Sequence, residues 1–381
     1  MASTSRKIDE DGGPAPHGEG PVIVWFRSDL RVADNLALSE AVGRGGAVVA
    51  VFVMDETRDA PRRLGGARRW WLHHSLQALA GSLEERDIQL VLRTGGSREE
   101  VLALAGEVGA AALYWNRRYD PAGVAADKKI MSDAKEKRLE VRSFPGQLLH
   151  EPQETLTGGG GPYRVYTPFW RALQAGDEPR APVDAPGKAK RRAPPAASEN
   201  LADWKLQPAK PDWSGGIAES WEPGEEGAAK RLESFISGAF DRYASGRDLP
   251  GEEGTSRLSP HLAFGEITPY QIWAQTSRRP AEVSGDDRTI YRKEVVWREF
   301  AYHLLFHNPD LASRNYNRHF DAMPWRRDDD AFRAWTRGAT GYPIVDAGMR
   351  QLWRTGWMHN RVRMITASFL TKHLLIDWRR G

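Results

Sequence analysis

Residues 254–260 have the residue types of an anion-binding turn. They read Gly-Thr-Ser-Arg-Leu-Ser-Pro, which combines three hydroxyl groups with one guanidinium. Pro260 suits the first position of a helix, and this predicts Ser259 at the N-cap. Backbone N–H groups at such a helix start can bind an anion, and Arg257 would add positive charge. The alternative, the more common outcome for an isolated segment, is that Ser259 only caps the helix and Arg257 lies on the surface.

A second candidate is a mixed charged and aromatic face within residues 291–300. Residues three and four positions apart share one face of a helix, so Glu294, Trp297 and Arg298 would project together. A carboxylate, an indole and a guanidinium on one face could bind a planar ligand that forms hydrogen bonds. The alternative is a surface ion pair between Glu294 and Arg298, worth only about 0.3–0.5 kcal/mol.

Residues 357–364 repeat this arrangement. Asn360, Arg363 and Met364 would share one face of a helix. Asparagine presents both a donor and an acceptor, as recognition of a heteroaromatic edge requires. The other face is apolar and is predicted to be buried; it comprises Val362, Ile365 and Phe369.

Thiolate and metal chemistry are not indicated. The chain has no cysteine, which excludes disulfides, cysteine nucleophiles and thiolate zinc sites. His303 and His307 have a spacing that can bind metal, but no acidic or histidine-rich segment completes a site. P-loop, G-x-S-x-G and H-E-x-x-H motifs are also absent from the sequence. We therefore expect no metal.

The distribution of charge indicates a polyanionic partner. The whole chain has a formal net charge of +3, whereas residues 287–381 contain 17 Lys and Arg against 10 Asp and Glu. The same segment contains six of the 15 tryptophans. Arginine interleaved with indole is typical of surfaces that bind phosphates and stacked bases. The alternative is a helical core with solvated arginines.

The front of the chain has the pattern of a parallel α/β domain that could position these groups. Short valine-rich apolar runs alternate with amphipathic stretches, as in a doubly wound sheet. The predicted strands are 22–26, 48–53, 88–93, 112–115 and 139–143, and the predicted helices are 66–85, 97–108 and 122–138. No G-x-G-x-x-G follows the first strand, which disfavours a nicotinamide cofactor.

The back of the chain is predicted to be all helical. Expected helices cover 224–243, 262–276, 286–307, 329–337, 343–355 and 357–376. We divide the chain into a disordered tail (1–20), an α/β domain (21–150), an interdomain linker (151–220) and a helical domain (221–381). Residues 176–215 are rich in Pro, Ala and Lys, a composition typical of linkers. With no membrane-spanning apolar run and no signal peptide, we expect a cytoplasmic protein.

Five segments, taken together, resemble the photolyase/cryptochrome family. The first is Val-Ile-Val-Trp-Phe-Arg-Ser-Asp-Leu-Arg at 22–31, followed by Asp34 and Asn35. The others are 254–260, 294–300, 341–350 and 358–364, and all occur in the family's order. The Asn-Arg-Val-Arg-Met at 360–364 makes the chain most similar to class I cyclobutane pyrimidine dimer photolyases.

The resemblance implies an N-terminal antenna domain and a C-terminal helical domain that binds FAD in a folded, U-shaped conformation. The flavin contacts it implies are Tyr243, Thr255, Ser256, Arg257, Leu258, Ser259, Tyr291, Glu294, Arg298, Trp357, Asn360 and Arg363. The residues that would face the dimer are Glu294, Trp297, Asn360 and Met364. Trp325 and Trp378 match the outer and middle members of an electron-transferring tryptophan chain.

The resemblance leaves the antenna chromophore open: it could be a deazaflavin, a folate or another flavin, or the protein could have no antenna. Gly123 stands where folate-binding members carry glutamate, which makes a folate the less favoured choice. Family members continue well past Gly381, so the FAD-binding domain is expected to be incomplete and C-terminally truncated.

The implied function is light-driven repair of cyclobutane pyrimidine dimers in damaged DNA by electron transfer from reduced FAD. The protein is expected to act as a monomer without an obligate protein partner. Three alternatives remain at this point: a cryptochrome-type blue-light photoreceptor, a repair enzyme for the (6-4) photoproduct, and an inactive truncated fragment.

Overall fold

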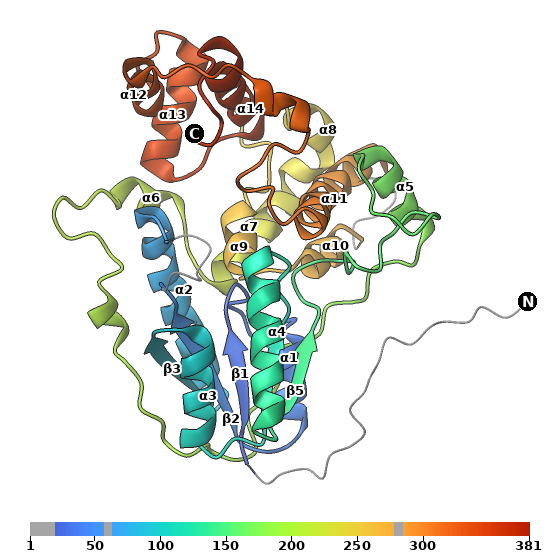
Figure 1. Cartoon of the computed structure of the whole chain (residues 1–381), viewed down its shortest axis with the longest axis vertical. Helices are drawn as coiled ribbons and strands as arrows, with labels where there is room; N and C mark the ends of the chain where they lie inside the picture. The colour runs from blue at the N-terminus through green and yellow to red at the C-terminus, as the bar shows by residue number, and fades with distance from the viewer. Residues whose placement is uncertain (1–19, 57–62, 278–284) are drawn as a thin grey trace, which may run out of the picture.

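A computed structural model describes residues 20–56, 63–277 and 285–381. The tail predicted over 1–20 therefore lies, apart from Gly20, outside the described residues. The front of the chain forms a five-stranded parallel sheet of order β3-β2-β1-β4-β5 (Figure 1). Its strands are β1 (Val22–Phe26), β2 (Val48–Met54), β3 (Gln89–Thr94), β4 (Ala112–Asn116) and β5 (Glu140–Phe144). All five predicted strands are confirmed, with each boundary within one residue.

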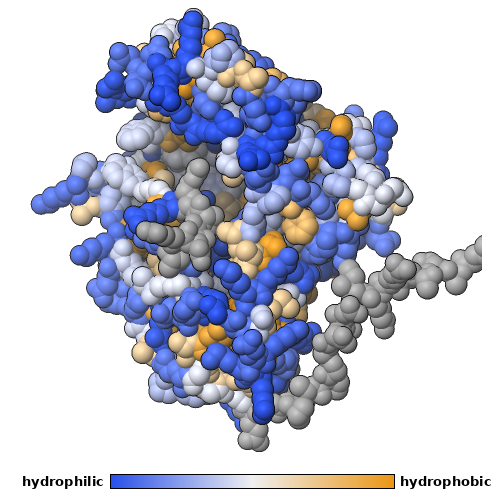
Figure 2. All heavy atoms as spheres, viewed as in Figure 1, coloured by the Kyte–Doolittle hydropathy of each residue, from blue (hydrophilic) through white to orange (hydrophobic). Residues whose placement is uncertain are grey.

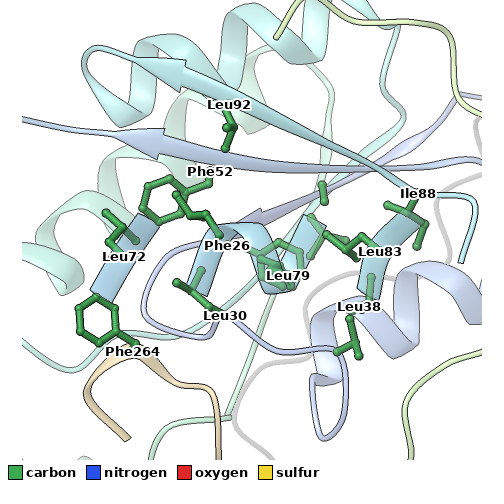
Figure 3. Packing of buried hydrophobic residues seen from close by; sticks show 14 of the residues in the cluster. Phe26, Leu30, Leu38, Phe52, Leu72, Leu79, Leu83, Ile88, Leu92 and Phe264 are labelled. Atoms are coloured by element: carbon green, nitrogen blue, oxygen red, sulfur yellow. The ribbon is translucent and has the colours of Figure 1, made fainter. Parts of the chain in front are cut away.

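Helices cover both faces of this sheet, as its continuous apolar strands require. They are α1 (Leu36–Gly43), α2 (Gly66–Glu84), α3 (Ser97–Glu107) and α4 (Pro121–Glu136). Every residue of β1 and β2 is buried, because side chains on both faces enter a core. One core lies against α1 and α2, and the other against α3 and α4. Figure 3 shows the first core, where Phe264 from the helical half joins the strand residues Phe26 and Phe52.

The rest of the described chain is helical and contains no further sheet strand. Its α-helices are α5 (Tyr166–Ala175), α6 (Gly215–Ser220), α7 (Glu225–Ser237), α8 (Tyr243–Gly246), α9 (Ser259–Phe264), α10 (Pro269–Ser277), α11 (Gly285–His307), α12 (Asp329–Arg337), α13 (Pro343–Thr355) and α14 (Asn360–Ser368). Short 3-10 turns are η1 (Leu201–Trp204), η2 (Ala239–Arg242) and η3 (Arg318–Ala322), and η4 (Phe369–His373) is a π-helix. The predicted α/β domain and helical domain are therefore both present.

Three of the predicted helices are interrupted or shortened. The stretch 224–243 breaks at Gly238 into α7, η2 and α8. The stretch 262–276 is two helices, since Gly265 ends α9 with a φ of 69°. A Cβ at Gly265 would overlap the backbone of Ser28 in the α/β half, so close packing also selects glycine here. The helix predicted over 357–376 begins only at Asn360 and becomes a π-helix at Phe369.

The Pro-rich segment 176–215 packs along one edge of the sheet (Figure 1). Leu92 in the edge strand β3 donates its N–H to Ser198 Oγ at 3.0 Å and accepts the N–H of Glu199 at 2.9 Å. These bonds satisfy backbone groups that an exposed edge strand would leave unpaired. The segment 151–220 also includes α5, η1 and α6, so it has structure of its own.

A buried carboxylate joins the two halves. Glu266, just after α9, is fully buried. It accepts hydrogen bonds from Trp71 Nε1 of α2 at 2.9 Å and from the backbone N–H of Gly224 at 2.8 Å, and it pairs with His261 Nδ1 at 2.5 Å. Arg31 crosses the same junction and donates to Gly265 O at 3.0 Å. These contacts fix α9, and with it the turn before α9, against the α/β domain.

Helices α12, α13 and α14 form a separate lobe with its own apolar core. In Figure 1 this lobe lies at the end of the molecule opposite the sheet. Hydrophilic residues cover most of the lobe in the view of Figure 2. Three candidate regions of the sequence therefore come from different parts of the helical half: the turn before α9, helix α11 and helix α14.

Candidate functional site

The turn 255–258 is held in place by contacts with α11. Arg257 adopts a left-handed backbone conformation, with φ of 51°, which is uncommon for a residue with a side chain. Leu258 is buried in the core that also contains Tyr243 and Tyr291. The Ser256 side chain lies beside the hydroxyl group of Tyr291. Burial raises the pKa of Tyr291, so the phenol stays protonated.

The predicted N-cap at Ser259 is wrong. Helix α9 starts at Ser259 itself, the N-cap is Leu258, and no side chain caps this end. Pro260 lies in the first turn, as expected for a residue without an N–H. The shift of one residue leaves the Ser259 side chain exposed.

Arg257 faces the segment that leads into α14. Its guanidinium lies 4.6 Å from the ring centroid of Trp357 and pairs with Glu253 at 2.9 Å. Burial and the neighbouring Arg257 lower the pKa of Arg231. Positive charge is thus concentrated at this junction, where it favours an anionic ligand.

His359 at the start of α14 is buried at the same junction. Its Nδ1 accepts the N–H of Arg361 at 3.1 Å, which places the ring proton on Nε2. Burial and then Arg361 lower the pKa of His359, so the neutral ring is favoured. Arg257 Nε is buried without a hydrogen-bond partner among the described residues, and the His359 ring lies beside the backbone of Arg247. Phosphate oxygens of a ligand would satisfy the Arg257 donor, and a guanidinium beside the hydroxyl groups of this turn fits a flavin nucleotide.

The exposed face of α14 has the composition that the sequence predicts. Asn360, Arg363 and Met364 are all exposed, and Met364 has an exposed fraction of 57%. Val362 and Phe369 are buried, which confirms two of the three residues expected on the opposite face. Ile365 is 41% exposed, so that prediction is wrong. Ile365 is exposed because it is next to Met364 in the chain, and the exposed arc of α14 includes both positions.

Glu294 on α11 is bound by Arg247, a residue that no sequence pattern indicates. Arg247 Nη1 lies 2.6 Å from Glu294 Oε1, and its guanidinium is 5.5 Å from the ring centroid of Tyr243. Arg361 Nε pairs with Asp248 Oδ1 at 2.6 Å and thereby connects α14 to the end of α8. Tyr243, Glu294 and α14 are in this way held together by charged contacts. Only the tertiary structure reveals Arg247 and Asp248, because the sequence separates each from its partner by more than 40 residues.

Trp297 and Arg298 contact other partners than Glu294 does. Trp297 is 46% exposed and stacks on Tyr166, with ring centroids 3.6 Å apart and an angle of 5° between the planes. Arg298 donates to Gln147 O at 2.6 Å and so contacts the segment that follows the sheet. The surface ion pair considered between Glu294 and Arg298 is not formed, because each side chain has another partner. Tyr166 carries no recognisable signal in the sequence.

Trp325 and Trp378 lie outside this cluster of contacts. Their segments meet, since the N–H of Arg326 donates to Leu375 O at 2.7 Å. Trp378 Nε1 donates to Asn315 Oδ1 at 2.8 Å. No ring contact joins the two indoles to each other or to Trp357 within the part of the chain that the structure describes.

The site offers cations, donors and aromatic faces rather than a nucleophile. In the described ranges, no three His, Cys, Asp or Glu side chains are grouped as metal ligands. None of the described helices is both long and apolar enough to span a membrane. Two small cavities, of about 220 and 160 Å³, lie elsewhere, one beside Val183 and Gln271 and one beside Trp170 and Trp273.

Comparison with known proteins assigns the architecture. The family model for DNA photolyase matches residues 22–187, and the model for the FAD binding domain of DNA photolyase matches residues 291–381. The deoxyribodipyrimidine photo-lyase of Agrobacterium fabrum is 55% identical over 361 residues, which are 95% of this chain and 75% of that protein.

Solved structures agree with this assignment. A bacterial class III photolyase from Agrobacterium tumefaciens superposes with a TM-score of 0.92 at 52% identity, over 98% of this chain and 78% of the other. A Synechocystis cryptochrome superposes with a TM-score of 0.84 at 26% identity, over 94% and 76% of the two chains. Fold and site define a two-domain protein with an α/β photolyase domain and a helical FAD-binding domain. The chain belongs to the DNA photolyase/cryptochrome family.

The expected subclass is not supported. The Agrobacterium structure at 52% identity is described as a class III photolyase, whereas residues 360–364 suggested class I.

Proposed function

We propose that this protein repairs cyclobutane pyrimidine dimers in DNA in a light-dependent reaction, as a deoxyribodipyrimidine photo-lyase. The observation that carries the proposal is the convergence of the turn 255–258, α11 and the segment before α14 around Arg257, whose Nε is buried without a hydrogen-bond partner among the described residues. An exposed indole and a carboxylate, Trp297 and Glu294, lie on the adjoining face of α11. The 55% identity to the Agrobacterium fabrum photo-lyase supports the same conclusion.

FAD would be held by the turn before α9 and by α14. The hydroxyls of Thr255 and Ser259 and the guanidinium of Arg257 suit its phosphates, and Asn360 and Arg363 suit its polar edges. Tyr243, Ser256, Leu258, Tyr291, Arg298 and Trp357 would complete the enclosure, mainly by packing. When bound, reduced and excited by blue light, FAD supplies one electron that opens the cyclobutane ring and is then returned, so the reaction is redox-neutral.

The protein's own residues recognise and hold the lesion. A dimer stacks and pairs poorly, so turning it out of the duplex costs only about a few kcal/mol. Trp297 offers an aromatic face on which the dimer can stack. Glu294, an acceptor when ionised, would accept a hydrogen bond from a base N–H, and Arg247 fixes its orientation at 2.6 Å. Asn360 and Met364 would contact the dimer from the exposed face of α14.

Trp325 and Trp378 are assigned a separate role as electron-transfer residues that allow reduction of the flavin. The backbone contact between their segments supports this assignment. Replacing either by phenylalanine should slow photoreduction while dimer binding stays unchanged.

The direct test is repair by the flavin-loaded, reduced protein. An oligonucleotide with one thymine dimer is incubated in blue light and in darkness, and the remaining dimer is quantified by chromatography. Loss of the dimer in light alone is expected. A protein that contains reduced FAD and leaves the dimer intact in light would refute the proposal.

A cryptochrome-type photoreceptor is the second candidate, because the Synechocystis cryptochrome has the same fold at a TM-score of 0.84. Affinity separates the two functions. Binding of dimer-containing DNA no tighter than binding of undamaged DNA would favour the photoreceptor.

A further inference from the structure

Tyr166, the first residue of α5, lies directly behind the two residues of α11 proposed to face the lesion. Its ring covers one face of Trp297, with the centroids 3.6 Å apart and the planes nearly parallel. Its hydroxyl donates to the backbone oxygen of Lys293 at 2.8 Å, one residue before Glu294. Tyr166 thus contacts the indole through its ring and the backbone beside the carboxylate through its hydroxyl.

The placement of Tyr166 is fixed by a small apolar core. Phe169 and Trp170 of α5 are buried against Val296 and Phe300 of α11. The ring of Phe300 also meets Tyr166 and Trp297 edge-on, at centroid distances of 5.8 and 5.9 Å. Burial, and then the charge of Glu294, raise the pKa of Tyr166, so its hydroxyl remains a donor near neutral pH.

This geometry restricts how Trp297 can move. An indole that is 46% exposed would ordinarily exchange between rotamers in solution. With one face on Tyr166 and one edge on Phe300, the ring is held in a single orientation and its opposite face stays available. An aromatic base would then extend the stack as a third ring, at a lower cost in side-chain entropy.

We propose that Tyr166 is a positioning residue for lesion recognition: it holds Trp297 in the orientation that accepts the extruded dimer. This inference rests on the proposed function, because it assumes that Trp297 stacks on the lesion. It predicts that the aromatic ring of Tyr166, and not its hydroxyl, determines the preference for damaged DNA.

The test compares Tyr166→Leu with Tyr166→Phe in the flavin-loaded protein. Binding to a dimer-containing oligonucleotide and to its undamaged counterpart is measured at one salt concentration. Tyr166→Leu should lower the preference for the dimer about three- to tenfold, the loss expected for one aromatic pair. Tyr166→Phe should stay within about twofold of the wild type. Tyr166→Met replaces the leucine variant if that variant does not fold.

A double-mutant cycle separates positioning from a general structural effect. In a Trp297→Ala background, Tyr166→Leu should change the preference no further, because its effect acts through the indole. Tyr163→Leu is the matched control: Tyr163 packs on Phe169 and His303 in the same core, without a described ring contact to Trp297. The control should leave the preference unchanged.

The outcomes separate a failure of the proposed function from a failure of the inference about Tyr166. A wild-type protein without preference for the dimer would overturn the proposed function and this inference together. A clear wild-type preference that survives Tyr166→Leu, or an equal loss in Tyr163→Leu or in the Trp297→Ala background, would overturn the inference alone.

Discussion

Trp297 is the residue on which the proposed recognition of damaged DNA most depends. Large aromatic side chains are usually buried, yet this indole is 46% exposed and is supported from behind by Tyr166. Arg257 has the corresponding proposed role on the cofactor side, since its guanidinium lies over Trp357 and its Nε is buried without a partner among the described residues.

Replacing Trp297 by alanine should weaken binding to dimer-containing DNA by about 1–3 kcal/mol, the value of one stacked base. Binding to undamaged duplex, which depends mainly on phosphate contacts, should change little. A fluorescence titration with both oligonucleotides measures the two affinities. An unaltered preference for damaged DNA would contradict the role assigned to the indole.

Replacing Arg257 by glutamine should weaken FAD binding by about 1.5–3 kcal/mol, because a charged donor to the cofactor is lost. The measurement is FAD content after gel filtration, followed by a titration of the apoprotein. Arg354→Gln is the matched control, since Arg354 is exposed and pairs across the surface with Glu219 at 3.4 Å. Equal FAD retention in both variants would show that Arg257 is not a flavin ligand.

At the scale of elements, the position of α14 depends on its contact with α13. Gly348 lies where α13 meets α14, and a Cβ there would overlap Val362 Cγ1 and lie 3.5 Å from Met358 Sδ. Glycine therefore lets the two helices approach closely. The approach sets the location of Asn360, Arg363 and Met364 relative to the turn before α9.

Gly348→Ala should lower the free energy of unfolding by about 1–3 kcal/mol and reduce FAD content, since α14 must shift to admit the methyl group. Urea unfolding and absorption spectra of the purified variant measure both effects. Gly106→Ala is the control: that glycine lies within α3 with open space around its Cβ, and alanine there should stabilise by up to about 1 kcal/mol. Unchanged stability and flavin content in Gly348→Ala would mean that α14 tolerates the displacement.

At the scale of the whole molecule, hydrogen bonds connect α11 to the segment that follows the sheet. Glu299 is buried and accepts the backbone N–H groups of Leu149 at 2.8 Å and His150 at 3.3 Å. Burial raises the pKa of Glu299 to about 8. The helix that carries Trp297 is thus anchored through a carboxyl group that stays protonated at neutral pH.

This anchor predicts a pH dependence of stability. Between about pH 4.5 and pH 8 the unfolded chain releases the Glu299 proton while the folded protein keeps it, so the free energy of unfolding falls as pH rises. In Glu299→Gln this decrease in the free energy of unfolding should be absent. The free energy of unfolding of the variant minus that of the wild type should therefore rise by up to about 1.4 kcal/mol per pH unit in this range. Urea unfolding of both proteins at several pH values tests this prediction. Glu252→Gln is the control, because Glu252 is exposed. A difference between Glu299→Gln and wild type that stays constant with pH would contradict the prediction.

Local sequence patterns were sufficient for most of the fold. The strands of the sheet are continuous apolar runs, and α12 and α13 have the predicted bounds, because periodicity and capping act over a few residues. The breaks at Gly238 and Gly265 were missed, since a glycine ends a helix only where the surroundings require it. At Gly265 that requirement is the backbone of Ser28, more than 200 residues away in the chain.

By itself the sequence determined the family of the protein and the composition of its candidate site: hydroxyls and an arginine before α9, a carboxylate and an indole on α11, an amide and an arginine on α14. Only the tertiary structure decided which groups meet them. Arg247 binds Glu294, Tyr166 stacks on Trp297, and Arg257 lies over the ring of Trp357. The physical reason is that helical spacing fixes which side chains share a face, whereas pairing between elements depends on packing and burial across the entire chain.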